Sequence, residues 1–302
     1  MLTNAQIDIR DTYILPYEGK YYMYGTTGRD AFTGSEKGFQ CYVGTDLHNW
    51  DGPYPIFPND GRSWADFNYW APEVYAVNGY VYLFGSWTNR GNEQILCVLR
   101  ADGPLGPFEI LNDKLGEGND PTLYEKDGQF YLVHNNGFER MFATPLTADL
   151  SRFAGASVPL FSRMDHEVSW AVGGPTEGAE TFITPTGRLL VLWSSFCKGH
   201  SKKFEEMGFH GMDYGTAIAY SPSGDIRGPY IHEDKMITPP NMGHCNLFYR
   251  NDGQLMLATH YPDDNENDFG CSNPIFFPIQ YDPDGDTLRI ESKEFEILKM
   301  LH

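Results

Sequence analysis

The chain has 302 residues, enough for one large domain or two smaller ones with a substantial core. Its 22 Lys and Arg residues against 41 Asp and Glu residues leave a formal net charge of -19. This charge disfavours nucleic acids and anionic membranes as partners, because both would be repelled, and it otherwise serves solubility.

The first residues and the cysteines bear on the cellular compartment. Residues 1–10 have neither a basic nor an apolar signal-peptide region, and no run of about 18 apolar residues follows. We therefore expect a cytoplasmic protein, although a secretory signal removed earlier would leave no trace. The cysteines lack the spacing of a zinc site and are predicted to be free thiols. They are Cys41, Cys97, Cys197, Cys245 and Cys271.

One turn-and-strand pattern recurs five times along the chain. The copies are EGKYYMYG at 18–25, NGYVYLFG at 78–85, DGQFYLVH at 127–134, TGRLLVLW at 186–193 and DGQLMLAT at 252–259. Asp-Gly or Asn-Gly between alternating β-prone runs predicts a tight hairpin, because both central residues of the turn need positive φ. Three copies carry such a dipeptide, and the other two keep its glycine.

A second turn follows each of the first four hairpins, at 44–51, 101–109, 147–153 and 223–230. Each unit therefore holds three or four strands, as a propeller blade does. The one good helical candidate is the short segment 202–207, which disfavours folds that need a helix between strands. We predict an all-β, five-bladed β-propeller in a single domain, 1–302, with a β-sandwich or a two-domain β protein as the weaker alternative.

An ionisable residue stands six to ten positions before each hairpin glycine. These residues are Asp11, Glu73, Asp120, Glu177 and His244. The first strand of each blade lines the central channel of a propeller, so we expect the five side chains to converge there. Crowded carboxylates raise the pKa of at least one member, and an acid facing a base is the machinery of glycoside hydrolysis. Any one of them alone would be explained more simply as a turn cap.

Five segments, in order and one in each predicted blade, resemble the signature segments of glycoside hydrolase family 43. They are IRDTYIL at 9–15, WAPEVY at 70–75, NDPTLY at 119–124, TEGAETF at 176–182 and GHCNLF at 243–248. The resemblance spans residues 9 to 262. It implies a five-bladed propeller that hydrolyses arabinofuranosyl or xylosyl linkages with inversion.

The resemblance also implies a role for each matching residue. Asp11 would be the general base, Glu177 the general acid, and Asp120 the carboxylate that orients and tunes the acid. His244 would help to hold a calcium ion or a water cluster in the channel, completed largely by water because calcium takes six to eight oxygens. Trp70 would lie near the sugar. No organic cofactor is expected.

The segment that holds the acid departs from the family pattern. Ala179 replaces an expected proline, and a second acid, Glu180, follows three residues after Glu177. Strand alternation would place Glu177 and Glu180 on opposite faces, so only one is expected to face the axis. Glu177 is chosen because it keeps the Glu-Gly pair.

Three tryptophans are assigned by their place in the pattern. Trp70 and Trp170 lie just before first strands, at the expected channel mouth, and with Glu73 they are the predicted substrate-binding residues. Trp193 lies inside an apolar strand, so it is expected in the core.

Two segments fall outside the blade pattern. Residues 195–214 form its longest interruption and are expected either to wall the pocket, favouring attack on terminal sugars, or to be ordinary surface. The Asp-rich segment 260–268 lacks the spacing of a calcium-binding loop and is interpreted as a solvated acidic loop.

Two classes of function follow from this pattern. The first is a glycosidase that cleaves terminal pentosyl linkages, α-L-arabinofuranosides or β-xylosides, of plant-type polysaccharides or oligosaccharides, with galactan side chains as a further alternative. Its partner is the carbohydrate substrate. The second is a non-catalytic propeller that binds carbohydrate or protein, since a fold does not fix a function. A binding protein has no need of a matched acid and base, so the carboxylates favour the enzyme. The sequence does not predict the pentose, its linkage or the oligomeric state.

Overall fold

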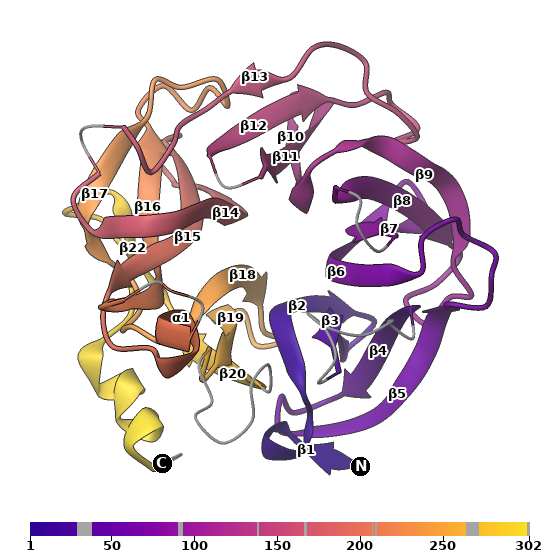
Figure 1. The fold of residues 1–302 in the computed structure, drawn as a ribbon, viewed down its shortest axis with the longest axis horizontal. Helices are drawn as coiled ribbons and strands as arrows, with labels where there is room; N and C mark the ends of the chain where they lie inside the picture. Colours follow the sequence, from indigo (N-terminus) through magenta and orange to yellow (C-terminus); the bar gives the residue numbers. More distant parts are fainter. Residues whose placement is uncertain are drawn as a thin grey trace.

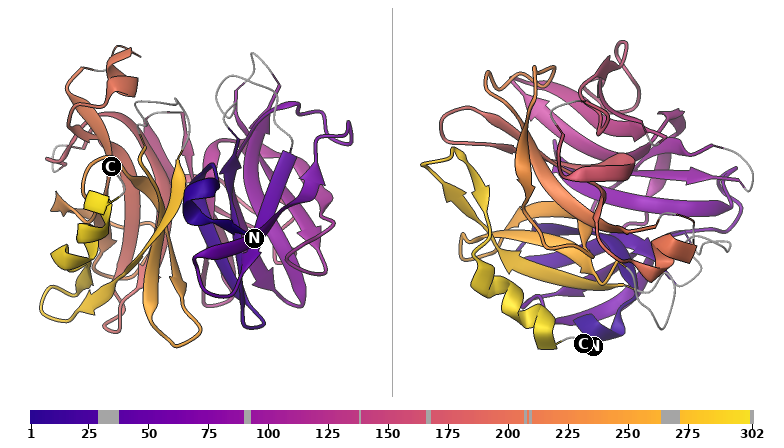
Figure 2. Two further views of the ribbon diagram at one scale, coloured as in Figure 1. Left: turned by 90° about the horizontal axis from the view of Figure 1, so that it is seen from below. Right: turned by 60° about the vertical axis from the view of Figure 1, so that its left-hand side comes forward.

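The computed structural model describes residues 1–28, 38–89, 93–137, 139–165, 168–206, 208, 210–263 and 272–300. Five antiparallel sheets lie in a ring around a central axis, each with its first strand innermost (Figure 1). Figure 2 shows the same ring from the side, with the short helix α1, Lys202–Glu206, projecting past the ends of the strands. The arrangement confirms the predicted all-β, five-bladed β-propeller.

The blades follow one another along the chain. Blade 1 comprises β2 (Ile9–Tyr17), β3 (Lys20–Thr27), β4 (Gly38–Gly44) and β5 (Asn49–Pro58), with β1 (Leu2–Thr3) on its outer edge. Blade 2 comprises β6 (Phe67–Val77), β7 (Tyr80–Thr88), β8 (Ile95–Ala101) and β9 (Glu109–Glu117). Blade 3 comprises β10 (Asn119–Lys126), β11 (Gln129–Asn136), β12 (Arg140–Pro145) and β13 (Val158–Pro159).

The last two blades and the terminal elements complete the ring. Blade 4 comprises β14 (Ala171–Ile183), β15 (Leu189–Lys198), β16 (Met212–Ser221) and β17 (Ile231–Met236). Blade 5 comprises β18 (Gly243–Tyr249), β19 (Leu255–Tyr261) and β20 (Asn273–Pro278). The remaining elements are η1 (Asn4–Gln6), the hairpin of β21 (Gln280–Asp282) and β22 (Thr287–Arg289), and η2 (Ser292–Met300).

The hairpin glycines adopt the backbone that the sequence predicts. All five have positive φ, from 76° at Gly19 to 91° at Gly187. Three hairpins close in two residues, and Glu18 joins Asn78 and Asp127 in taking positive φ beside its glycine. The Asp-Gly at 252–253 lies in a longer connection, 250–254, so there the prediction of a two-residue turn was wrong.

The hydrophobic core is divided among the five junctions between neighbouring blades. The cluster between blades 1 and 2 is built on Phe39 and Trp87, and the one between blades 3 and 4 on Phe161 and Trp193. Three further clusters occupy the other junctions. Trp193 is fully buried, as expected. Because each blade packs only on its neighbours, the core holds the inner strands in a closed ring and fixes what they present to the axis.

Several smaller expectations are also settled by the described residues. Four cysteines are buried free thiols, as predicted, and Cys271 lies outside these residues. Segment 195–214 begins as the end of β15 and finishes as the start of β16, with α1 between them; residues 207 and 209 are not described. Among the described helices none is long and apolar enough to cross a membrane.

Candidate active site

Every inner strand contains one extra residue at the same place. Between two paired positions the inner strand advances three residues while its partner advances two, as from Arg10–Thr26 to Tyr13–Tyr24 in blade 1. The same step recurs in the other four blades. We call the residue after the first pair the bulge position. Its occupants all have positive φ: Asp11 (53°), Ala71 (44°), Asp120 (50°), Gly178 (59°) and His244 (51°).

The five ionisable residues do not all occupy the same position relative to the bulge, which corrects the expectation from the sequence. Asp11, Asp120 and His244 do share one position. Glu177 lies one residue before the bulge position of its blade, and Glu73 lies two residues after it. Counting back from a turn cannot detect these shifts, because the hairpin connections differ in length and the extra residue moves the side chains that follow it.

The three ionisable residues at the bulge positions meet at the axis. The Nδ1 atom of His244 lies 3.3 Å from Asp11 Oδ1 and 3.7 Å from Asp120 Oδ2. The hydroxyl of Thr26 donates to Asp11 Oδ2 at 2.6 Å, and the Gly178 amide donates to Asp120 Oδ2 at 3.2 Å. A Cβ on Gly178 would lie 3.1 Å from His244, so the left-handed backbone and the close approach both favour glycine there.

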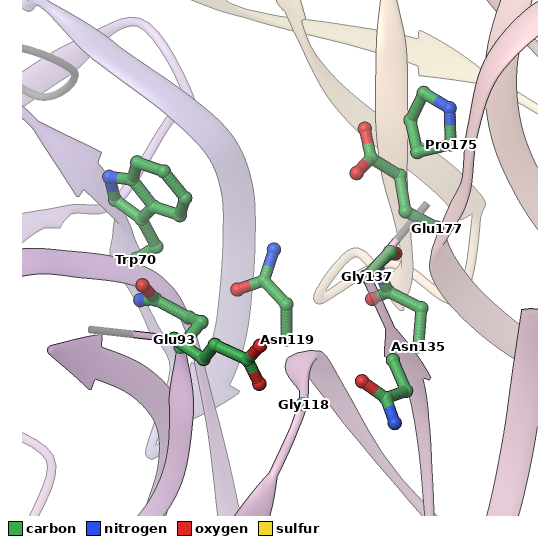
Figure 3. Close-up of a pocket in the computed structure, with 10 residues that line it drawn as sticks. Trp70, Glu93, Gly118, Asn119, Asn135, Gly137, Pro175 and Glu177 are labelled. Carbon is green, nitrogen blue, oxygen red and sulfur yellow. The ribbon is translucent and has the colours of Figure 1, made fainter. Parts of the chain in front are cut away.

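Glu177 projects from the position before the bulge, where blades 2 and 3 carry Trp70 and Asn119. These three side chains line a pocket of about 330 Å³ (Figure 3). The rest of its lining is Glu93, Gln94, Gly118, Asn135, Asn136, Gly137 and Pro175. The pocket therefore joins an indole face, several amides and a carboxyl, which is the composition of a sugar-binding site.

The surroundings move the pKa values of Asp11 and Glu177 apart. Burial raises the pKa of Glu177 to about 8, Asp120 adds to the rise, and a 2.7 Å hydrogen bond from the Tyr214 hydroxyl opposes it. Burial would also raise the pKa of Asp11, but His244, His260 and Arg10 outweigh it and lower that pKa. Near neutral pH the pair therefore contains a proton donor and an ionised base.

Asp120 is the third carboxyl of this cluster. Burial and the nearby Asp11 raise its pKa well above the ordinary value, against the hydrogen bond from Gly178. Asp120 and Glu177 therefore compete for protons, and each makes ionisation of the other less favourable.

A second pair of carboxyls lies deeper in the propeller. Glu73 is 4% exposed, accepts a hydrogen bond from Thr122 at 3.1 Å and bonds to the Tyr75 hydroxyl. Glu180, at the same strand position in blade 4, accepts from the Asn246 amide at 2.8 Å. Burial raises the pKa of both, that of Glu180 to about 7. Glu73 is thus a link between blades and not a lining residue of the pocket, which corrects its predicted substrate contact.

The two candidate acids of blade 4, Glu177 and Glu180, lie at different depths in the propeller. The bulge between Glu177 and Glu180 interrupts strand alternation, so the expectation of opposite faces was wrong. Glu177 lines the pocket, whereas Glu180 is buried against blade 5. This arrangement supports Glu177 as the acid.

Trp170 does not occupy the channel mouth. It is 8% exposed and packs in the core between blades 3 and 4, with its ring centroid 4.8 Å from that of Trp193. Its place just before a first strand is misleading, since β14 begins at Ala171 and reaches the bulge only at Gly178. Trp70, by contrast, lines the pocket as expected.

The side chains around His244 do not by themselves fit a calcium ion. Among the described residues no group of three or more His, Cys, Asp and Glu side chains is arranged to hold a metal. The Nδ1 atom of His244 is directed at Asp11 and Asp120 instead. Oxygen ligands for calcium would have to come mainly from water.

Three residues of the site were missed by the sequence analysis. Tyr214 contacts Glu177, His260 accepts the Asp11 amide at 3.2 Å, and Asp263 lies 3.1 Å from His260 Nε2. His260 and Asp263 are buried, which corrects the interpretation of their segment as a solvated loop; residues 264–268 are not described. A signal for His260 exists, because the seventh residue after every hairpin glycine is polar. These residues are Thr26, Ser86, Asn135, Ser194 and His260.

Comparison with known proteins agrees with this geometry. The chain is 23% identical over 214 residues to the extracellular endo-α-(1→5)-L-arabinanase 1 of Bacillus subtilis, a match that covers 65% of this chain and 60% of the relative. A solved endo-arabinase of Bacteroides thetaiotaomicron superposes with a TM-score of 0.77 at 24% identity, over 94% of this chain and 98% of that one. An endo-1,4-β-xylanase of the same organism gives 0.73 at 23%, covering 96% of each chain.

These structural matches show a shared fold. The family itself is shown by its sequence model, that of the glycosyl hydrolases family 43, which matches residues 5–287. With a five-bladed propeller and three carboxyls gathered at its axis, the chain belongs to glycosyl hydrolases family 43.

Proposed function

We propose that this chain hydrolyses pentosyl linkages, α-L-arabinofuranosides first and β-xylosides second, with inversion at the anomeric carbon. The observation that carries the proposal is that three blades bring Asp11, Asp120 and Glu177 together beside the pocket. The surroundings lower the pKa of Asp11 and raise that of Glu177 to about 8. The names of the similar proteins, two arabinanases and a xylanase, support the choice of sugars.

The proposed reaction uses one water molecule and two carboxyls. Ionised Asp11 takes a proton from the water as its oxygen attacks the anomeric carbon. The glycosidic bond breaks, and the departing oxygen takes the proton of Glu177. Burial keeps Glu177 protonated near neutral pH, and Asp120 adds to this effect. Through the Gly178 amide, Asp120 also holds the backbone beside Glu177.

Trp70 and Asn119 are proposed to hold the sugar against Glu177. The Gln94 amide donates to Ser86 Oγ at 3.1 Å, and Ser86 in turn donates to Asn119 Oδ1. Because this oxygen is occupied, the Asn119 NH₂ group faces the pocket between Trp70 and Glu177 (Figure 3). It offers donors to a sugar hydroxyl, while the indole gives the ring an apolar face.

Hydrolysis of 4-nitrophenyl α-L-arabinofuranoside, 4-nitrophenyl β-D-xyloside, arabinan and xylan tests the proposal, with Asp11→Asn and Glu177→Gln as controls. We expect turnover of at least one pentoside, its loss on every substrate in Asp11→Asn, and its loss on the polysaccharides in Glu177→Gln. Proton NMR of the first product should show the inverted anomer, and the product lengths from arabinan distinguish terminal from internal attack. A protein that binds arabinan but turns over none of these substrates would be the non-catalytic propeller.

The calcium ion near His244 stays a prediction. Metal analysis of the purified protein and of His244→Gln tests it directly. One calcium per chain that is lost in the variant would support it, and a metal-free active enzyme would refute it.

A further inference from the structure

We propose that Tyr214 and His260 form a stacked pair that positions the acid and the base relative to one another. This inference rests on the proposed roles of Glu177 and Asp11. The Tyr214 hydroxyl donates to Glu177 Oε1 at 2.7 Å, and His260 Nδ1 accepts the backbone amide of Asp11 at 3.2 Å. The two rings stack with centroids 6.2 Å apart and an interplanar angle of 23°. One aromatic pair thus connects both residues.

The His260 ring is fixed in one tautomer. Its Nε2 atom lies 3.1 Å from Asp263 Oδ1, a carboxylate that also forms a buried ion pair with Arg10. Nε2 therefore carries the proton, which leaves Nδ1 free to accept from Asp11. Burial and the charge of Arg10 lower the pKa of His260 to about 4, so the ring is neutral at working pH. The groups that face it are Arg10, Asp11, Asp263 and Tyr214.

In two other blades, the residue equivalent to His260 accepts the backbone amide of the bulge residue in the next blade. In blade 1, Thr26 accepts the Ala71 amide of blade 2 at 2.8 Å, and in blade 4, Ser194 accepts the His244 amide of blade 5 at 2.8 Å. His260 does the same from blade 5 to Asp11 of blade 1. A residue other than glycine with a left-handed backbone is strained and persists only where its surroundings hold it. The contact therefore fixes the backbone from which the base projects.

Contacts of its ring and its backbone also fix the position of Tyr214. Its ring lies over Gly243, where a Cβ would come within 2.2 Å, so a side chain at that position would displace it. Its carbonyl accepts the Asn241 amide at 2.8 Å, and the Asn241 carbonyl accepts the Asp263 amide at 2.8 Å. The main chain thus connects the Tyr214 strand to the residue that orients His260. A shift of either ring would be passed to the other.

Tyr214→Phe tests the acid side of the pair. The hydroxyl stabilises ionised Glu177 against burial and the neighbouring carboxyls of Asp120 and Asp11, with His244 as the remaining facing group. Its loss should move the alkaline limb of the kcat/KM profile upward by roughly one pH unit and lower kcat about tenfold. Tyr220→Phe, on the same strand, is the matched control and should change neither. A lower kcat with an unmoved alkaline limb would overturn the role of Tyr214.

His260→Leu and His260→Asn test the base side. Asparagine places an oxygen close to the position of Nδ1, so it keeps an acceptor for the Asp11 amide, whereas leucine does not. We expect kcat to fall at least tenfold in the leucine variant and to recover most of that loss in the asparagine variant, at similar melting temperatures. Equal losses in both folded variants would overturn the role of His260. If Asp11→Asn and Glu177→Gln abolish turnover of arabinan while neither ring matters, only this inference fails and the proposed function stands.

Discussion

Asp11 and His244 come from opposite ends of the chain and meet with 3.3 Å between Oδ1 and Nδ1. The contact closes the ring, because blade 5 there touches blade 1, and it places the proposed general base at the seam. The seam has further ties, from the Asn273 amide to the Ile7 carbonyl at 2.9 Å and from Arg10 to Asp263. The position of the base thus depends on correct closure of the propeller.

Removal of the acid should affect substrates according to their leaving groups. Glu177→Gln should lower kcat/KM on arabinan by roughly 10²–10⁴-fold, the usual contribution of general acid catalysis. The loss should be much smaller on 4-nitrophenyl glycosides, because nitrophenolate departs without a proton. Glu93→Gln, which changes another carboxyl that lines the pocket, is the control. Equal losses on both kinds of substrate would argue against Glu177 as the acid.

Removal of Asp120 should move the alkaline limb of the pH profile downward. Activity needs ionised Asp11 and protonated Glu177, so it falls as pH rises through the Glu177 pKa of about 8. In Asp120→Asn one of the groups that raise this pKa is gone, and Glu177 loses its proton at lower pH. The kcat/KM profile between pH 5 and 10 measures the shift, and an unmoved limb would contradict the role of Asp120.

Trp70→Ala and Trp170→Ala form a pair with opposite expectations. The first removes a face of the pocket and should raise KM about tenfold or more, with little change in melting temperature. The second opens a cavity in the core between blades 3 and 4 and should destabilise the protein by about 3–5 kcal/mol, with KM unchanged in the folded fraction. Thermal unfolding and steady-state kinetics separate the two. A raised KM in Trp170→Ala at full stability would restore its predicted sugar contact.

Asn119→Leu should weaken substrate binding. The change removes the NH₂ donors that face the pocket, and KM is expected to rise roughly tenfold while kcat changes less. Ser86→Ala releases the amide without removing it, so a smaller rise in KM is expected. A fall in melting temperature with unchanged KM would mean that Asn119 serves the blade junction and not the sugar.

The sequence by itself determined the number of blades and most of the ionisable side chains that meet at the axis. Local backbone sterics require glycines such as Gly19 and Gly128 at their turns. A requirement that is local in this way can be recognised from the amino-acid sequence alone. Asp11, Asp120 and His244 could be aligned across blades because each keeps its place relative to its strand. The polar residue seven positions after each hairpin glycine was equally visible and was not used.

Only the tertiary structure decided which side chains share the pocket. The extra residue at the bulge position of each inner strand moved Glu73 and Glu180 below the site and left Glu177 beside Trp70 and Asn119. Tyr214 became part of the site through a contact across the sheet of blade 4, and His260 through a contact from blade 5 to blade 1, and no spacing along the chain records either contact. Local backbone preference sets where a chain turns, whereas the partners of a side chain depend on how separate blades pack, and that packing is a property of the whole ring.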